Sequence, residues 1–370
     1  MSEKRSNEGA GKNLFAVPFD ALQSGMEIFG DIYDSNAERV LVRGNTLLNE
    51  KMIYMVGNLN KGGGSVYVSE NTYKQIYNDK PAETENTIVR QELEQETGYS
   101  DFKKNTLKVM DTITKEKTLH QDMLYFMSNK LSKKLDEVEP TTIVSLVNAL
   151  APVDEYLQRH CVNVSLLNGM VGKWMGMSKE DIDRLVLIGL LHDCGKALVP
   201  TQVLNVPRKL TAVEFEVIKM HPVHSYNLLE GFPEYVRVAV RGHHEKVNAK
   251  GYPDSVATEA ISLDARITAI SDIYDAMVSQ RAYKTPKSPF STLAMLSELK
   301  GTDLDGEVVD LFVQKMPQEL IDKEVMMSDG VVGTVHSFDL KDIEYPTISV
   351  NGRITKSSEN WHCKSMYTKE

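Results

Sequence analysis

Apolar residues recur at helical spacing from residue 141 to residue 320, and no strand-like alternation interrupts them. So long a stretch without strand signals predicts a bundle of helices packed around one core. Near its middle, residues 181–194 are apolar nearly all round after Arg184, which predicts a helix buried on every side. The predicted fold class is therefore mainly α.

The two flanks of this bundle differ from it in pattern. Strand-like stretches separated by turn residues predict a small α+β regulatory module over 13–80, preceded by a disordered tail over 1–12. The charge-rich residues 81–140 predict a helical linker, which could pair with a copy of itself and form a homodimer. Residues 321–370 predict a short β-rich appendage, which leaves 141–320 as the bundle.

Composition narrows the kinds of partner and the location. The chain carries 42 Lys and Arg against 52 Asp and Glu, a net charge of −10, which argues against binding to duplex nucleic acid. Its three cysteines form no CxxC pair, as expected in a reducing cytosol. The longest apolar run, residues 185–191, is far shorter than the ~20 residues of a membrane span. We therefore expect a cytoplasmic protein without a membrane span.

Histidines and aspartates inside the predicted bundle are the residues most suited to chemistry. A lone histidine on a helix is usually a satisfied core or surface residue, so each group is weak alone. Together, imidazoles and carboxylates on successive helices are the ligand types of Mn, Fe and Zn, and bundles hold such ions centrally. His192 and Asp193 directly follow an apolar run, where ionic groups are costly unless they are paired or bind a metal. The predicted metal ligands are His160, His192, Asp193, His221, His243, His244 and Asp272.

These groups occur in the order and spacing of a known family. Over roughly residues 145–315 the chain resembles the HD-GYP family of metal-dependent cyclic-dinucleotide (cyclic di-GMP) phosphodiesterases. The N-terminal segment resembles, more weakly, a small α+β module that often precedes this domain in bacterial proteins. The matching pieces are His160, His192-Asp193-Cys194-Gly195-Lys196, His221-Pro222, His243-His244-Glu245, Gly251-Tyr252-Pro253, Ser271-Asp272-Ile273-Tyr274-Asp275 and Arg281-Ala282-Tyr283-Lys284.

The resemblance implies a helical-bundle HD-type metallohydrolase domain with two divalent transition-metal ions per chain. Fe or Mn is the expected metal, with Ni, Co or Zn as alternatives. One ion would be held at the positions of His160, His192, Asp193 and Asp272. The other would be held at the positions of Asp193, His221, His243 and His244, so that Asp193 would bridge the two ions.

The resemblance also implies a reaction. This is the hydrolysis of cyclic di-GMP to linear pGpG, with further hydrolysis to GMP left open, by a metal-bridging hydroxide in bacterial second-messenger signalling. Asp193 and Lys196 match the catalytic positions, with Lys196 beside the scissile phosphate. We expect Gly195 to adopt a positive φ that aims Lys196 at the site. The positions that match substrate-binding residues are Gly251, Tyr252, Pro253, Asp275, Arg281 and Lys284.

Three positions depart from the family pattern. Tyr156 stands where some members carry a Glu that holds a third metal, which favours two ions here. Asn248-Ala249 stands where the family usually has Asp-Gly, and the loss of Gly restricts the loop backbone. Ser225 replaces a usual Gly and is expected to be a packing variant.

Two alternative functions stay open. The altered Asn248-Ala249 loop keeps open a weakly catalytic cyclic-dinucleotide receptor, although a pure receptor has no chemical need of Lys196. The same chemistry could also act on cyclic GMP–AMP, because nothing in the sequence settles the second base. Glu245 has two interpretations, either a residue that orients a liganding histidine or an ordinary helix-end charge.

Overall fold

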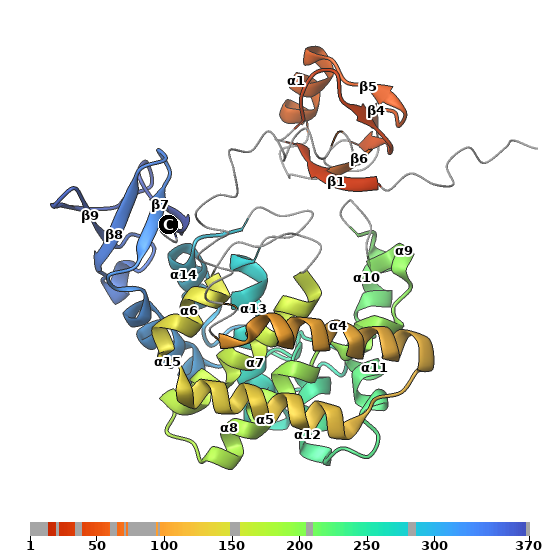
Figure 1. The fold of residues 1–370 in the computed structure, drawn as a ribbon, viewed down its shortest axis with the longest axis vertical. Helices are drawn as coiled ribbons and strands as arrows, with labels where there is room; N and C mark the ends of the chain where they lie inside the picture. The colour runs from red at the N-terminus through yellow and green to blue at the C-terminus, as the bar shows by residue number, and fades with distance from the viewer. Residues whose placement is uncertain are drawn as a thin grey trace, which may run out of the picture. The chain divides into compact units, whose positions relative to one another are not determined.

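The chain divides into two compact units, and each is described by itself (Figure 1). One is formed mainly by the residues up to Thr84 and the other by most residues from Glu85 onward. The expected tail over 1–12 lies outside the described residues. The computed structural model describes residues 14–19, 22–33, 39–59, 65–69, 72, 94, 97–148, 156–204, 210–279 and 286–367.

The N-terminal unit is a small α+β fold, as predicted. Its four-stranded sheet has the order β1-β6-β2-β5, and the first two strands run antiparallel with Val17 opposite Val66. Buried aliphatic side chains, among them Ile28, Val56 and Val68, form a separate core. The elements are β1 (Leu14–Pro18), β2 (Glu27–Ile28), β3 (Ile32–Tyr33), β4 (Val40–Val42), β5 (Thr46–Leu47), α1 (Glu50–Leu59) and β6 (Ser65–Ser69).

The larger unit is the predicted helical bundle with a terminal sheet. Several helices begin at a side-chain cap, among them α8 and α10. Ser178 accepts a hydrogen bond from the Asp181 backbone N–H, and Thr211 forms a complete capping box with Glu214. The principal helices are α4 (Tyr99–Glu116), α5 (Gln121–Glu137), α6 (Pro140–Asn148), α7 (Tyr156–Trp174), α8 (Lys179–Leu191), α10 (Ala212–Ile218), α11 (His221–Leu228), α12 (Glu234–Gly242), α13 (Leu263–Val278), α14 (Pro289–Leu299) and α15 (Gly306–Lys315).

Residues 81–140 differ from the linker that the sequence predicts. Their described part forms α4 and α5, separated where Lys117 adopts a φ of 57°. One face of each helix is apolar, so that Phe102, Ile113 and Leu131 are buried in the same core as the rest of the bundle. The charged opposite faces gave this stretch its linker-like composition. Both helices therefore belong to the bundle.

Helices α7 and α8 form the centre of the bundle. Residues 159–172 of α7 are all buried. Gly189 of α8 lies against the α7 backbone, because an added Cβ would come within 2.6 Å of the Ser165 Cα atom. The Ser165 hydroxyl donates to the Val186 carbonyl oxygen at 2.6 Å and fixes the same contact. This close approach brings His160 of α7 next to His192, which directly follows α8.

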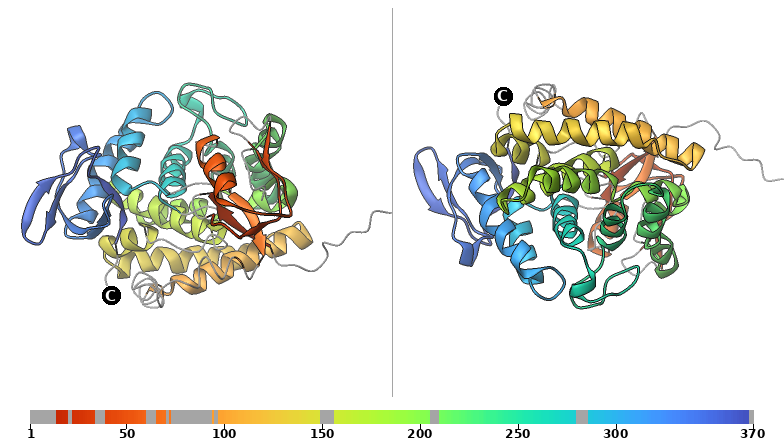
Figure 2. Two further views of the ribbon diagram at one scale, coloured as in Figure 1. Left: turned by 90° about the horizontal axis from the view of Figure 1, so that it is seen from above. Right: turned by 90° about the horizontal axis from the view of Figure 1, so that it is seen from below.

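The C-terminal strands form one five-stranded antiparallel sheet in the order β10-β9-β8-β7-β11. Figure 2 shows this sheet at one end of the helical bundle from two opposite sides. Val325, Val335 and Ile348 point into the core that the helices share. No helix in the described part of the chain is long and apolar enough to cross a membrane. The strands are β7 (Glu324–Met327), β8 (Val332–Ser337), β9 (Thr347–Val350), β10 (Arg353–Lys356) and β11 (Cys363–Met366).

Gly189→Ala tests the close packing of α7 on α8. The added methyl would clash with the Ser165 backbone, so we expect the free energy of unfolding to fall by about 1–3 kcal/mol, measured by urea denaturation. Gly306→Ala is the matched control, because its Cβ would meet only the flexible Lys300 side chain, at 3.7 Å. Wild-type stability of the Gly189 variant would contradict this packing.

Candidate metal centre

Three of the predicted ligands share one local geometry at the ends of helices. His192, His221 and His243 each lie within three residues of the last residue of α8, α10 or α12. Each ring places its Nδ1 atom 2.6–2.8 Å from the carbonyl oxygen three residues earlier. A carbonyl oxygen at a helix end lacks its helical partner and can only accept, so Nδ1 carries the proton. The Nε2 lone pair of each histidine therefore faces the centre of the site.

His160 reaches the same orientation through a carboxylate. Its Nδ1 atom donates to Asp275 Oδ2 at 2.7 Å, and the other oxygen of Asp275 accepts from Asn163 at 2.6 Å. Asn163 in turn accepts a hydrogen bond from the hydroxyl of Tyr99 on α4. This buried chain of polar groups fixes the ring of His160 from α7, α13 and α4.

Asp275 is therefore wrongly predicted as a substrate-binding residue. Its side chain has no exposed surface, and both carboxylate oxygens are already bound within the bundle. Asp275 lies three residues after Asp272, about one helical turn further along α13. Periodicity alone could not show that this turn points toward His160 instead of toward a ligand.

Asp193 lies between two groups of histidines. Its Oδ2 atom is 3.3 Å from His160 Nε2 and 3.4 Å from His192 Nε2, whereas its Oδ1 atom is 3.1 Å from His221 Nε2. Two sets of potential ligand atoms result, each within 4.8 Å of one another, and both contain Asp193. They are His160, His192 and Asp193, and Asp193, His221, His243 and His244. One carboxylate thus faces two neighbouring positions for an ion.

Asp272 closes the space between the two sets. Its Oδ1 atom is 3.1 Å from His160 Nε2, and its Oδ2 atom is 3.7 Å from His244 Nδ1. Neighbouring imidazole rings continue around the site, with centroids 5.0 Å apart for His192 and His243 and 4.1 Å apart for His243 and His244. The structure therefore brings together all seven predicted metal ligands.

The charge states suit cation binding. Burial alone would favour neutral carboxyls, but Lys196 and His192 outweigh it and hold the pKa of Asp193 well below its usual range. Burial also favours neutral imidazoles and lowers the pKa of His244 to about 3. For His160, burial acts in the same direction, but the carboxylates of Asp193, Asp272 and Asp275 outweigh it and raise the pKa to about 10. The carboxylates thus attract positive charge to the His160 Nε2 atom.

Unpaired buried atoms show that the residues fit a metal ion. Buried His243 Nε2 has no hydrogen-bond partner, and buried Asp193 Oδ1 and His221 Nε2 contact each other at 3.1 Å without forming a hydrogen bond. The Nε2 atoms of His160 and His192 lie 3.2 Å apart, and both also face Asp193 Oδ2. Buried polar atoms without a partner are costly, and a cation bound here would give them one. The donor set of imidazoles and carboxylates suits divalent transition metals.

The turn after Asp193 places a lysine at the site. Lys196 Nζ is 2.6 Å from Asp193 Oδ2, and the lysine side chain retains partial exposure. Gly195 does not have the positive φ that the sequence predicts. Its small size is needed instead because an added Cβ would come within 2.5 Å of the Ser225 backbone nitrogen and would also meet the His221 carbonyl. Ser225 accepts from the Gly195 N–H at 2.8 Å and donates to the His192 carbonyl, which makes it part of this turn.

The loop of Gly251-Tyr252-Pro253 lies beside the second set of ligands. The Tyr252 ring centroid is 4.7 Å from that of His244, and the Tyr252 N–H donates to the His244 carbonyl. Glu245 is buried, and its carboxylate accepts three backbone N–H groups, from Asp254, Ser255 and Val256. Neither interpretation offered for Glu245 by the sequence holds, because it anchors this loop.

Neighbouring residues accommodate Asn248-Ala249, which stands where the family usually has Asp-Gly. Asn248 Nδ2 donates to Asp303 Oδ1 at 2.9 Å, a contact in which a carboxylate at position 248 would be repelled. Lys246 also pairs with Asp303, at 2.5 Å. Ala249 adopts a φ of 57°, the left-handed conformation that a glycine would adopt at lower cost. The loop therefore keeps its anchors.

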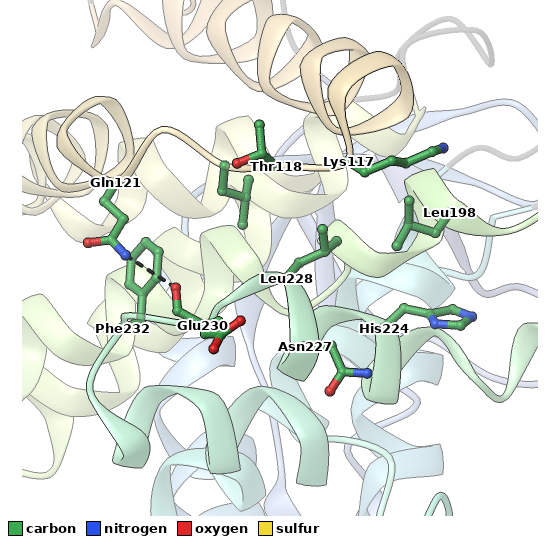
Figure 3. A pocket seen from close by; sticks show the side chains of 10 residues that line it. Lys117, Thr118, Gln121, Leu198, His224, Asn227, Leu228, Glu230 and Phe232 are labelled. Carbon is green, nitrogen blue, oxygen red and sulfur yellow. Dashed lines mark hydrogen bonds between the residues drawn. The ribbon is translucent and has the colours of Figure 1, made fainter.

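Several expectations fall elsewhere. Arg281 and Lys284 lie outside the described residues, as does the side chain of Tyr156. His224, one turn beyond His221, faces a different cavity of about 420 Å³. Figure 3 shows this cavity between the α4–α5 connection and α11, with Lys117 and Gln121 on its wall. None of its lining residues is a predicted metal or substrate residue.

Sequence reasoning missed Asn163, Asp303 and the role of Glu245. Asn163 could have been found from its place about one helical turn after His160. Asp303 carries no such signal, because it is 55 residues from Asn248 in the chain. Only the folded chain brings these two side chains together.

Comparisons with known proteins agree with this geometry. Residues 144–308 match the model of a protein family described as the HD domain. This part of the chain is therefore similar to the HD domain. The site contains clusters of histidines and aspartates that can bind a metal. The relatives described next confirm the predicted resemblance to the HD-GYP family.

Curated relatives of the HD domain are cyclic-dinucleotide phosphodiesterases. The response regulator RpfG of Xanthomonas campestris, a cyclic di-GMP phosphodiesterase, is 34% identical over 189 residues, 50% of this chain and 50% of that protein. The cyclic di-GMP phosphodiesterase PA4108 of Pseudomonas aeruginosa is 32% identical over 214 residues, 57% of this chain and 51% of that protein. The 3'3'-cGAMP-specific phosphodiesterase 1 of Vibrio cholerae is 32% identical over 190 residues, 50% of this chain and 44% of that protein. The chain spans about half the length of the curated relatives it matches.

A solved structure supports the fold. Bd1817 of Bdellovibrio bacteriovorus, described as an HDG"Y"P protein, aligns with a TM-score of 0.50 and 15% identity, over 82% of this chain and 100% of that chain. The mainly α fold class, with an HD-type bundle, a small N-terminal α+β module and a β-rich C-terminal part, is thereby confirmed.

Asp275→Asn tests whether this carboxylate orients His160. The amide removes the negative charge and offers only one acceptor, so we expect metal affinity to fall about 10- to 100-fold, measured by chelator competition. Asp310→Asn is the control, because Asp310 lies on α15 and makes an exposed pair with Lys300. Wild-type metal affinity in the Asp275 variant would show that His160 does not need this partner.

Proposed function

We propose that this chain hydrolyses a cyclic dinucleotide at the HD-domain metal centre, with cyclic di-GMP as the substrate and linear pGpG as the product. The observation that carries the proposal is Asp193, whose two oxygens face two adjacent sets of histidines. In many enzymes, two metal ions held by such neighbouring sets of ligands serve phosphoester hydrolysis. The naming of several curated relatives as cyclic di-GMP phosphodiesterases supports the substrate.

We further propose two divalent ions per chain. His160, His192, Asp193 and Asp272 would hold one ion, and His221, His243, His244 and Asp193 would hold the other. When bound, such ions lower the pKa of water and offset charge on a phosphate. Imidazole and carboxylate donors suit Fe or Mn, with Ni, Co or Zn as alternatives.

The residues around the ions have separate roles in this proposal. Asp193 is ionised and buried, so its negative charge would be shared by the two metal ions. Lys196 lies against Asp193 with a partly exposed ammonium group, so it can offset charge that develops on a bound phosphate. Gly251, Tyr252 and Pro253 form the substrate-facing loop beside His244. Arg281 and Lys284 stay predicted phosphate or guanine contacts.

One alternative substrate has support of its own. Two relatives from Vibrio cholerae, 27% and 32% identical, are named 3'3'-cGAMP-specific phosphodiesterases. Cyclic GMP–AMP is therefore the second candidate substrate. The receptor alternative rests on the Asn248-Ala249 loop, and it loses support because Asn248 still anchors that loop to Asp303.

Other expectations stay predictions. They are the cytoplasmic location, a homodimer, the further hydrolysis of pGpG to GMP, and the regulatory role of the N-terminal α+β module. The α4–α5 helices, expected to mediate a dimer, use their apolar faces inside the bundle. Only their outer faces are left for a second copy of the chain.

Product analysis with a Lys196→Ala variant tests the proposal. Protein loaded anaerobically with Fe(II) or Mn(II) is incubated with cyclic di-GMP or cyclic GMP–AMP, and the products are separated by liquid chromatography. We expect linear pGpG from the wild type, and a rate about 10²- to 10³-fold lower in Lys196→Ala at near-normal metal content, because a charge beside the phosphate is lost.

Lys115→Ala provides the control, since Lys115 forms a comparable but exposed pair with Asp111 on α4. Full metal loading without product from either dinucleotide would overturn the hydrolase and favour the receptor. An unchanged rate in Lys196→Ala would remove this lysine from the mechanism.

A further inference from the structure

An aromatic corner with a cation lies next to the metal centre, and two of its three residues, Phe215 and Lys219, belong neither to the ligands nor to the loop motif. Phe215 on α10 is 44% exposed, which is high for a phenylalanine beside a polar site. Its ring centroid is 6.4 Å from that of Tyr252, with the two planes at 79°. The two rings thus form two walls of one corner.

Tyr252 connects this corner to the metal ligands. On one side, its ring centroid is 4.7 Å from His244 and 6.5 Å from His221, and on the other it faces Phe215. A base bound in this corner would therefore be close enough for its own nucleotide's phosphate to reach the two sets of ligands. Phe215 and His221 belong to the successive helices α10 and α11, which fixes their separation.

Lys219 supplies the positive charge. Its Nζ atom lies 5.6 Å from the Phe215 centroid and 5.9 Å from the Tyr252 centroid, so it is within cation–π range of both rings. It also pairs with the exposed Glu216 at 2.6 Å, which leaves donor capacity on a three-donor ammonium. Two rings and one ammonium group thus converge at the edge of the site.

We propose that Phe215, Tyr252 and Lys219 form a guanine-binding subsite, a proposal that rests on the cyclic-dinucleotide hydrolysis proposed above. Aromatic faces stack on nucleobases. The adjacent ammonium group selects guanine, because the O6 and N7 atoms of guanine both accept hydrogen bonds. Adenine would present an amino donor at the position of O6 and would face Lys219 unfavourably. The subsite therefore decides which base lies beside the second set of ligands.

Two variants separate stacking from base selection. We expect Phe215→Ala to raise the KM for cyclic di-GMP about tenfold, the effect of losing one base–aromatic stack. The effect on bis(p-nitrophenyl) phosphate, a phosphodiester without a base, should be clearly smaller. Lys219→Met should reduce the preference for cyclic di-GMP over cyclic GMP–AMP, while Lys219→Arg should retain it. Val213→Ala is the control, because Val213 is 75% exposed on the same helix and touches none of the three residues in the contacts above.

The outcomes distinguish this subsite from the proposed function. Wild-type KM values for cyclic di-GMP in Phe215→Ala, or an equal loss with bis(p-nitrophenyl) phosphate, would overturn the subsite while the hydrolase stands. If no cyclic dinucleotide is hydrolysed, calorimetric titration of the metal-loaded protein with GMP and AMP decides. A GMP affinity that falls in Phe215→Ala and a GMP preference that falls in Lys219→Met would support the subsite, and unchanged affinities would overturn it.

Discussion

The carboxylate of Asp193 carries a charge inside the protein, and the surrounding helices are arranged to compensate it. Its side chain has essentially no exposed surface, so an isolated charge there would be prohibitively costly. Lys196 pairs with one oxygen, and three histidines, His160, His192 and His221, face the two oxygens. The close contact of α7 with α8, made possible by Gly189, is what brings the first two of these histidines within reach. The core packing and the metal centre therefore depend on the same helix pair.

Helix ends supply much of the orientation of the site. The unpaired carbonyls at the C-termini of α8, α10 and α12 each hold the Nδ1 atom of a histidine. Backbone geometry thus selects the nitrogen that faces an ion, without any further side chain. His160 lies inside α7, where no such carbonyl is free, and uses Asp275 instead. This difference explains why one histidine needs a buried carboxylate partner and three do not.

The sequence predicted those parts of the molecule whose physics is local. Helical periodicity predicted the bundle, and the motif residues predicted all seven potential ligands. It was wrong where the outcome depends on which face of a helix meets which neighbour. Asp275 turned inward to His160, and α4 and α5 joined the core although their composition resembles a linker. Contacts such as Asn248 with Asp303 join distant segments and leave no pattern in the chain.

Metal content measured by mass spectrometry, on the wild type and on Asp193→Asn, tests the central claim most directly. The account predicts about two ions per wild-type chain, because one carboxylate serves two sites. It predicts that Asp193→Asn loses most of its metal at both sites. Asp183→Asn is the control and should keep both ions, because Asp183 has a partly exposed side chain that pairs with Lys179. Two ions retained by a folded Asp193→Asn protein would contradict the shared role of this carboxylate.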